Sequence, residues 1–134
     1  MKMRQGFSCL LMVLGSLLTS GCDDDPAAPG IEPEIINSAE SFEFQVSRVG
    51  NYSGTLEYTW SNSESAANVD ESASLSAGSV QLTVFDAAGT IVHDEPVTDG
   101  SMATDDGDSG DWRVRVSFSE ATGTLNFRLQ PRTP

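Results

Sequence analysis

Apolar and polar residues alternate along most of the chain after Ser41, which is the pattern of strands with one buried face. Clear runs of this kind lie at 42–46, 56–60, 80–84, 90–95, 112–118 and 125–129. No run after the N-terminal segment shows helical spacing. Six to eight short antiparallel strands can bury their apolar faces only by packing sheet on sheet or by closing a barrel. The pattern therefore predicts an all-β fold, an antiparallel and jelly-roll-like β-sandwich.

Turn residues between these runs predict hairpins. Residues 50–54 are expected to join the first two strands, residues 86–89 the next two, and residues 120–123 the last two. The stretch 62–77 is rich in Ser, Ala and Asn and permits one weak edge strand. The stretch 96–110 has the composition of an exposed loop.

Trp60 and Trp112 stand in register with aliphatic neighbours on the inward side of their strands. This phase predicts that both lie in the core. The alternative, a platform on which a sugar stacks, would require an exposed tryptophan out of phase with those neighbours.

The N-terminal segment has the organisation of an export signal. Lys2 and Arg4 precede an apolar run, 7–18, that is shorter than the roughly 20 residues of a membrane-spanning helix. Small residues then lead to Cys22, and this arrangement resembles the lipobox of bacterial lipoproteins. The resemblance implies that the Cys22 thiol receives a diacylglyceryl group and that the chain is cut just before Cys22. The protein would then be anchored in the bacterial cell envelope, with the outer membrane or cell surface favoured over the inner membrane.

Three segments follow from this division. Residues 1–21 are the signal peptide, residues 22–39 an acidic, Pro-rich tether attached to lipid at Cys22, and residues 40–134 the β-sandwich domain. The tether combines Asp, Glu, Pro and Gly and is expected to stay extended, because it cannot bury enough apolar surface to order itself.

The charge of the chain limits the class of partner, and its cysteine content decides whether a disulfide can form. The mature chain keeps five arginines, no lysine and all 20 acidic residues, which gives a formal charge of −15. Such a chain repels nucleic acid, so none is expected as a partner. Cys9 is lost with the signal and Cys22 is taken by lipid, so no disulfide stabilises the fold.

The second half of the domain resembles the bacterial pre-peptidase C-terminal type of β-sandwich. The resemblance rests on alternation and turn glycines in the segments 79–89, 110–116 and 123–127. Members of that family are accessory domains on secreted proteins, usually attached to an enzyme. The resemblance therefore implies an accessory β-sandwich.

Little in the sequence favours catalysis. His93 is the only imidazole, and no nucleophile motif accompanies it. We expect His93 to be a partly exposed histidine of an edge strand. The sequence thus predicts a non-catalytic, lipid-anchored envelope lipoprotein that displays a binding or structural module. The alternatives are an accessory subunit, whose partner is another envelope protein, and a carbohydrate-binding module, whose partner is a glycan.

One candidate metal site lies in the acidic loop that contains Asp105, Asp106, Asp108 and Asp111. Oxygen ligands at alternate positions with glycines between them suit calcium, although the spacing is not that of an EF-hand. A solvated acidic turn is the simpler interpretation, and no other cofactor is expected.

One candidate ligand site consists of Arg113, Arg115 and Arg128. If the last two strands form a hairpin, Arg115 lies directly across from Arg128, with Arg113 on the same face. We expect this cluster to be paired with outward acids, for which Glu43 and Glu57 are the candidates. Binding of an anion or a carboxylate sugar is the alternative.

Overall fold

The computed structural model describes residues 31–133, in which all regular structure is β-strand. The strands are β1 (Glu34–Ser38), β2 (Ser41–Asn62), β3 (Ala66–Phe85), β4 (Ile91–Pro96), β5 (Gly100–Ala103) and β6 (Gly110–Arg132). They pair in the order β1-β2-β6-β3-β4, β5 also pairs with β3, and every pairing is antiparallel. The predicted all-β, antiparallel fold is confirmed. Within residues 31–133 no helix is long and apolar enough to cross a membrane.

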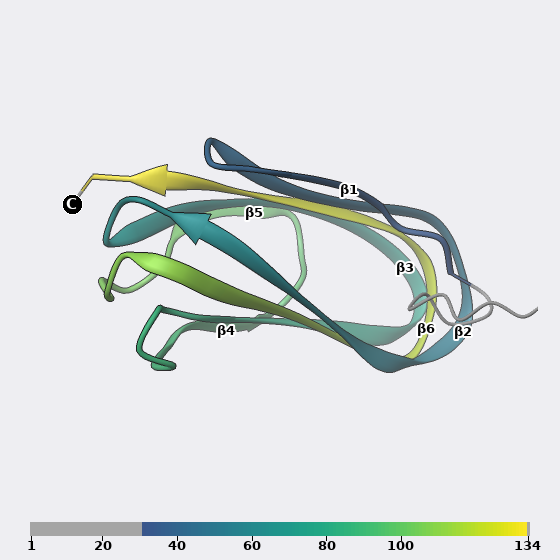
Figure 1. The fold of residues 1–134 in the computed structure, drawn as a ribbon. Coiled ribbons are helices and arrows are strands. Elements are labelled where there is room, and N and C mark those ends of the chain that lie inside the picture. Colours follow the sequence, from purple (N-terminus) through teal and green to yellow (C-terminus); the bar gives the residue numbers. More distant parts are fainter. Residues whose placement is uncertain (1–30, 134) are drawn as a thin grey trace, which may run out of the picture.

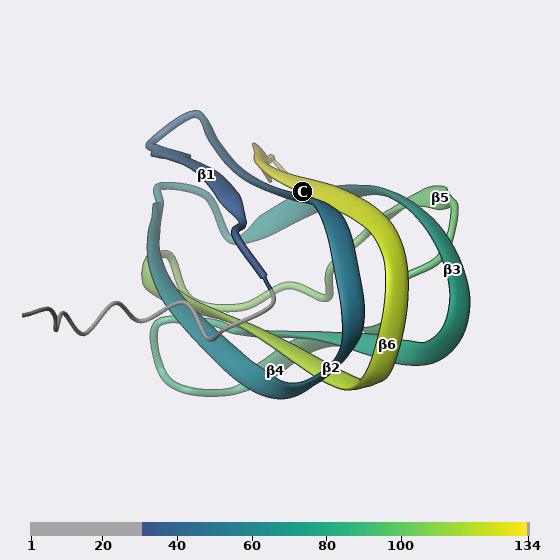
Figure 2. The ribbon, with the colours of Figure 1, turned by 90° about the vertical axis from the view of Figure 1, so that its right-hand side faces the viewer.

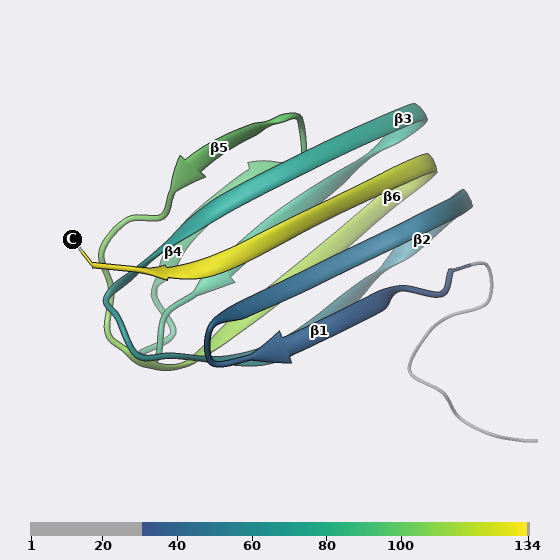
Figure 3. The ribbon, with the colours of Figure 1, turned by 90° about the horizontal axis from the view of Figure 1, so that it is seen from above.

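The sheet is folded over on itself, as Figure 1 shows. Strands β2, β3 and β6 are 22, 20 and 23 residues long, and each one bends near its middle and returns in a second layer (Figure 3). Layer A contains β1, β5 and the segments 42–49, 66–77 and 123–132. Layer B contains β4 and the segments 54–62, 79–85 and 110–118. Figure 2 views the same two layers from the bent end.

The bends coincide with register shifts and left-handed backbone. Asn51 and Glu120 have φ of 50° and 49°, and Gly78 has φ of 73°. A side chain at Gly78 would meet the backbone of Ser119 and Glu120, so β3 and β6 approach each other more closely here than a Cβ allows.

Two of the predicted hairpins are therefore wrong. Residues 50–54 and 120–123 lie inside continuous strands, where their turn residues serve as bends between the layers. Only residues 86–89 form the predicted hairpin turn, between β3 and β4. The expectation of short strands is wrong for the same reason.

Three segments are more ordered than predicted. Strand β1 pairs with β2 and Ile31 is buried, although both lie within the predicted tether 22–39. The stretch 62–77 contains most of the layer A half of β3, which lies between β6 and β5. Strand β5 interrupts the predicted loop 96–110. In each case pairing with a neighbouring strand outweighs a composition that favours loops.

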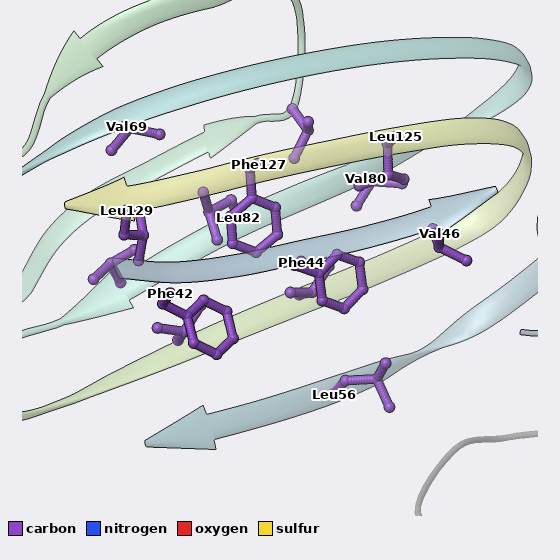
Figure 4. Packing of buried hydrophobic residues seen from close by; sticks show 14 of the residues in the cluster. Phe42, Phe44, Val46, Leu56, Val69, Val80, Leu82, Leu125, Phe127 and Leu129 are labelled. Atoms are coloured by element: carbon purple, nitrogen blue, oxygen red, sulfur yellow. The ribbon is translucent and has the colours of Figure 1, made fainter. Parts of the chain in front are cut away.

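The core lies between the two layers, and Figure 4 shows its aromatic and aliphatic side chains meeting there. Trp60 and Trp112 are paired in the β2–β6 register and are fully buried, with their rings packed edge to face at 6.1 Å. Their indole N–H groups donate to the carbonyls of Ser38 and Asp108 at 2.7 Å. The core prediction is confirmed, and neither ring is available to stack on a sugar.

Candidate binding surface

A shallow hollow of about 550 Å³ lies on layer A. Residues from β2, β3, β5 and β6 line it, so its shape depends on the pairing of four strands. Its lining includes carboxylates, primary amides, hydroxyls and one guanidinium. We call this feature the layer A hollow and define its outward polar lining as Glu43, Gln45, Asp70, Ser72, Ser101, Asn126 and Arg128. The buried Glu71 also lines it.

The charged residues of the hollow form one row across the strands. Glu43 lies opposite Arg128, Arg128 opposite Asp70, and Asp70 opposite Ser101. The Arg128 guanidinium is 3.6 Å from the Asp70 carboxylate, which also accepts the Ser101 hydroxyl at 2.5 Å. The cation therefore has an acid on each side in the strand register, and it forms an ion pair with Asp70.

The neighbouring row contains uncharged polar residues. Gln45 lies opposite Asn126, and Asn126 lies opposite Ser72. All three residues are exposed, and within residues 31–133 their side chains make no hydrogen bond to another residue. This row offers free donors and acceptors from three adjacent strands.

Two other arginines lie on layer B. Arg113 and Arg115 place their guanidinium carbons 4.4 Å and 4.8 Å from the centroid of the Phe85 ring, within cation–π distance. The Arg115 Nε also donates to Glu57 at 2.6 Å, and the two residues are opposite each other in the β2–β6 register.

The predicted arginine cluster is therefore only partly present. Arg115 and Arg128 lie in different layers, because β6 bends between them and does not form a hairpin. The expected pairing of Arg115 with Glu57 is confirmed. Glu43 lies opposite Arg128 in the β2–β6 register and therefore in layer A, whereas Arg115 lies in layer B.

The acidic loop is held mainly by its backbone. The N–H groups of Asp105, Gly107 and Asp108 donate to the Val92 carbonyl, the Ser65 carbonyl and the Asp86 carboxylate. The structure brings no three His, Cys, Asp or Glu residues into a metal-binding group within the range 31–133. Asp105, Asp106, Asp108 and Asp111 thus gain no support as a calcium site.

The Asp86 carboxylate attaches this loop to the β3–β4 turn. One of its carboxylate oxygens accepts the N–H groups of Ala88 and Thr90, at 3.0 Å and 2.8 Å, and the other accepts that of Asp108 at 2.8 Å. The Asp108 bond is the main reason that the pKa of Asp86 lies below its usual 3.8. This carboxylate joins the β3–β4 turn to the loop before β6.

Two ionisable residues are buried at the side of the sandwich closed by the β4–β5 connection. His93 is 7% exposed, and its Nε2 has no partner among the described residues. Burial lowers the pKa of His93 below 6.5, against the opposing effects of Glu95, Asp94 and Asp105. The prediction that His93 is partly exposed is wrong. A bulge at Val92 interrupts the alternation of β4, so that Val92 and His93 are both buried.

Glu71 is the second buried group, at 6% exposed. Its Oε1 accepts the Thr98 N–H at 3.1 Å, while its Oε2 has no partner within residues 31–133. Burial raises the pKa of Glu71 above 4.5, which the Thr98 N–H partly offsets and the Glu95 charge reinforces. This carboxylate holds the segment that crosses from layer B to layer A.

Sequence reasoning missed the uncharged row of the hollow. Alternation placed Gln45 and Asn126 on outward positions, but only the strand order makes them neighbours and adds Ser72 beside them. Cys22, the predicted lipidation site, lies outside the described residues. Neither a scan against models of protein families nor a search among curated proteins finds a match for this chain.

Proposed function

We propose that this protein is a lipid-anchored, non-catalytic lipoprotein of the bacterial envelope, in which the β-sandwich is a binding module. The anchor would be Cys22, which follows a charged and then apolar N-terminal segment of signal-peptide type. The layer A hollow is the observation that supports a binding role, because it gathers exposed polar side chains from three strands on one accessible face.

The position of Ile31 limits how far the module could lie from an anchor at Cys22. Ile31 is buried beside Val46, Ser47 and Arg48, next to the bent end of the sandwich. Eight residues, 23–30, then separate it from a lipidated Cys22, and the chain between the two reaches at most about 30 Å when extended. The module would therefore be held close to the membrane by its bent end.

Catalysis has little support from the buried histidine. His93 is the only histidine of the chain, and its burial removes it from solvent and from substrate. The resemblance to pre-peptidase C-terminal domains stays a prediction and agrees with an accessory role.

The test is mass spectrometry of the mature N-terminus together with membrane fractionation. We expect a lipid-modified Cys22 as the first residue and loss of membrane association in Cys22→Ser. Cys9→Ser, which changes a cysteine inside the signal segment, is the matched control and should remain membrane-bound. An unmodified Cys22, or a Cys22→Ser protein that still sediments with membranes, would overturn the anchoring proposal.

A further inference from the structure

We propose that the layer A hollow binds an uncharged glycan that lies across strands β2, β6 and β3. This inference deepens the proposed function by naming the ligand class, and it depends on the binding role of the module but not on its lipidation.

The spacing of the uncharged row is the first argument. Neighbouring strands lie about 4.8 Å apart, so the row from Gln45 through Asn126 to Ser72 spans about 10 Å. Sugar rings joined in a short chain present hydroxyl groups at comparable intervals. A glycan lying across the strands can therefore meet one polar side chain on each of three strands.

The chemistry of the row is the second argument. Each primary amide offers two donors and an acceptor, and the serine hydroxyl can donate or accept. A sugar hydroxyl has the same dual character, so either orientation of each bond is available. Because these three side chains make no hydrogen bond to another described residue, a ligand need not displace an internal partner.

The charge of the hollow is the third argument, and it selects against acidic ligands. Arg128 is the one cation of the lining, and it lies between Glu43 and Asp70 in the strand register. The lining is thus net negative, and the mature chain carries −15 in total. A glycan with carboxylate or sulfate groups would be repelled by the lining of the hollow and by the net charge of the chain.

Layer B offers the alternative ligand class. Arg113 and Arg115 lie together on Phe85, and anions favour such guanidinium pairs. However, Glu57 already binds Arg115, and the Arg115 charge acts on Asp94. The neighbouring polar side chains of layer B are hydrogen-bonded to each other, Thr55 with Ser117, and Gln81 and Thr83 with Asp94. The layer A hollow is therefore the better-supported site.

The experiment titrates the mature lipoprotein in detergent micelles with defined oligosaccharides. The uncharged probes are the hexasaccharides of cellulose, starch, chitin and laminarin, and the acidic probes are oligogalacturonate and a chondroitin sulfate hexasaccharide. We expect at least one uncharged probe to bind, with an affinity that changes little between low and high salt.

Variants locate the site. Gln45→Ala and Asn126→Ala should each weaken binding about three- to tenfold, the usual effect of losing one hydrogen bond. Gln81→Ala is the matched control, because Gln81 is a partly exposed glutamine on layer B that donates to Asp94. This change should leave binding unchanged. Thermal melting of each variant checks that the fold is retained.

Two results would overturn the proposal. Binding of only the acidic probes, weakened by salt and by Arg113→Ala, would place the site on layer B and overturn the proposal. No binding of any uncharged probe at about 10 mM, well above the range of weak specific complexes, would also overturn it. Either result leaves the anchoring proposal intact, since that proposal is tested by the modification of Cys22.

Discussion

At the scale of single residues, Asp86 joins two segments of the chain, because its carboxylate accepts three backbone N–H groups. We predict that Asp86→Ala lowers the free energy of unfolding by about 1–3 kcal/mol, since it leaves those donors without their partner. Asp106→Ala is the control, because Asp106 is exposed and should change stability by less than about 0.5 kcal/mol. Urea denaturation measures both, and equal stability of the two variants would contradict the assigned role.

His93 makes a second residue-scale prediction, which concerns pH. Its pKa is below 6.5 in the folded protein, mainly because burial disfavours the charged imidazolium. The folded state therefore binds this proton less readily than the unfolded state, and the stability linked to His93 is present above pH 6.5 and is lost as pH falls through the folded pKa.

The measurement is the free energy of unfolding of the natural chain and of His93→Leu at several pH values. We expect the difference between them to shift against the natural chain as pH falls below 6.5. The lowered pKa of Asp86 affects both proteins alike, whereas that of Asp94 depends partly on the His93 charge. The comparison is therefore made above about pH 5, where both carboxylates are ionised in the folded and unfolded states. A difference that does not change with pH would show that His93 titrates normally.

At the scale of elements, the bends decide how the sheet folds over. Gly78→Ala should destabilise the protein by about 2–4 kcal/mol, because φ is 73° there and a Cβ would meet the backbone of Ser119 and Glu120. Gly50→Ala is a matched control in the bend of β2, where no atom lies within 4 Å of the added Cβ. It should cost less than about 1 kcal/mol. Similar losses for both, measured by thermal or urea unfolding, would mean that the close contact of β3 with β6 is not needed for the bend.

Pairing between β2 and β6 gives a prediction for the ion pair of layer B. Arg115 and Glu57 are about two-fifths exposed, so Arg115→Ala should cost no more than about 1 kcal/mol. The double variant Arg115→Ala with Glu57→Ala should be non-additive, since the two side chains touch. Arg115→Ala with Glu43→Ala should be additive, because Glu43 lies in layer A opposite Arg128. Coupling of Arg115 with Glu43 would contradict the observed strand order.

The same elements show what the sequence could predict. Alternation identified the inward faces correctly, including both tryptophans, because burial of one face in two is a local property of a strand. It could not separate a hairpin from a bend, since Gly50 and Gly123 suit either one. The choice depends on whether a strand pairs with its own continuation or with another strand, which is a property of the whole sheet.

At the scale of the whole molecule, the candidate site shows the same limit. Each side chain of the layer A hollow stands at an outward position that alternation predicts, yet the residues come from segments as far apart as Gln45 and Asn126. The cluster of Arg113, Arg115 and Arg128 was predicted from a hairpin at residues 120–123, which would set Arg115 across from Arg128. Folding of β6 across both layers separates them and brings Arg128 beside Asp70.

The shape of the molecule also predicts its orientation if Cys22 is lipidated. Ile31 packs near the bent end, whereas the loop before β6 lies at the opposite end of the sandwich, as Figure 1 shows. The chain from Cys22 to Ile31 can reach at most about 30 Å even when fully extended, so Ile31 must stay close to the membrane surface. We therefore expect the bent end to face the membrane.

Fluorophores attached at Asn51→Cys and Asp106→Cys, both exposed positions, should report this orientation in vesicles that contain nitroxide-labelled headgroups. The label at residue 51 should be quenched more strongly than the label at residue 106, and removal of the anchor by Cys22→Ser should abolish quenching of both. Equal quenching of the two labels in the anchored protein would show that the tether does not orient the module.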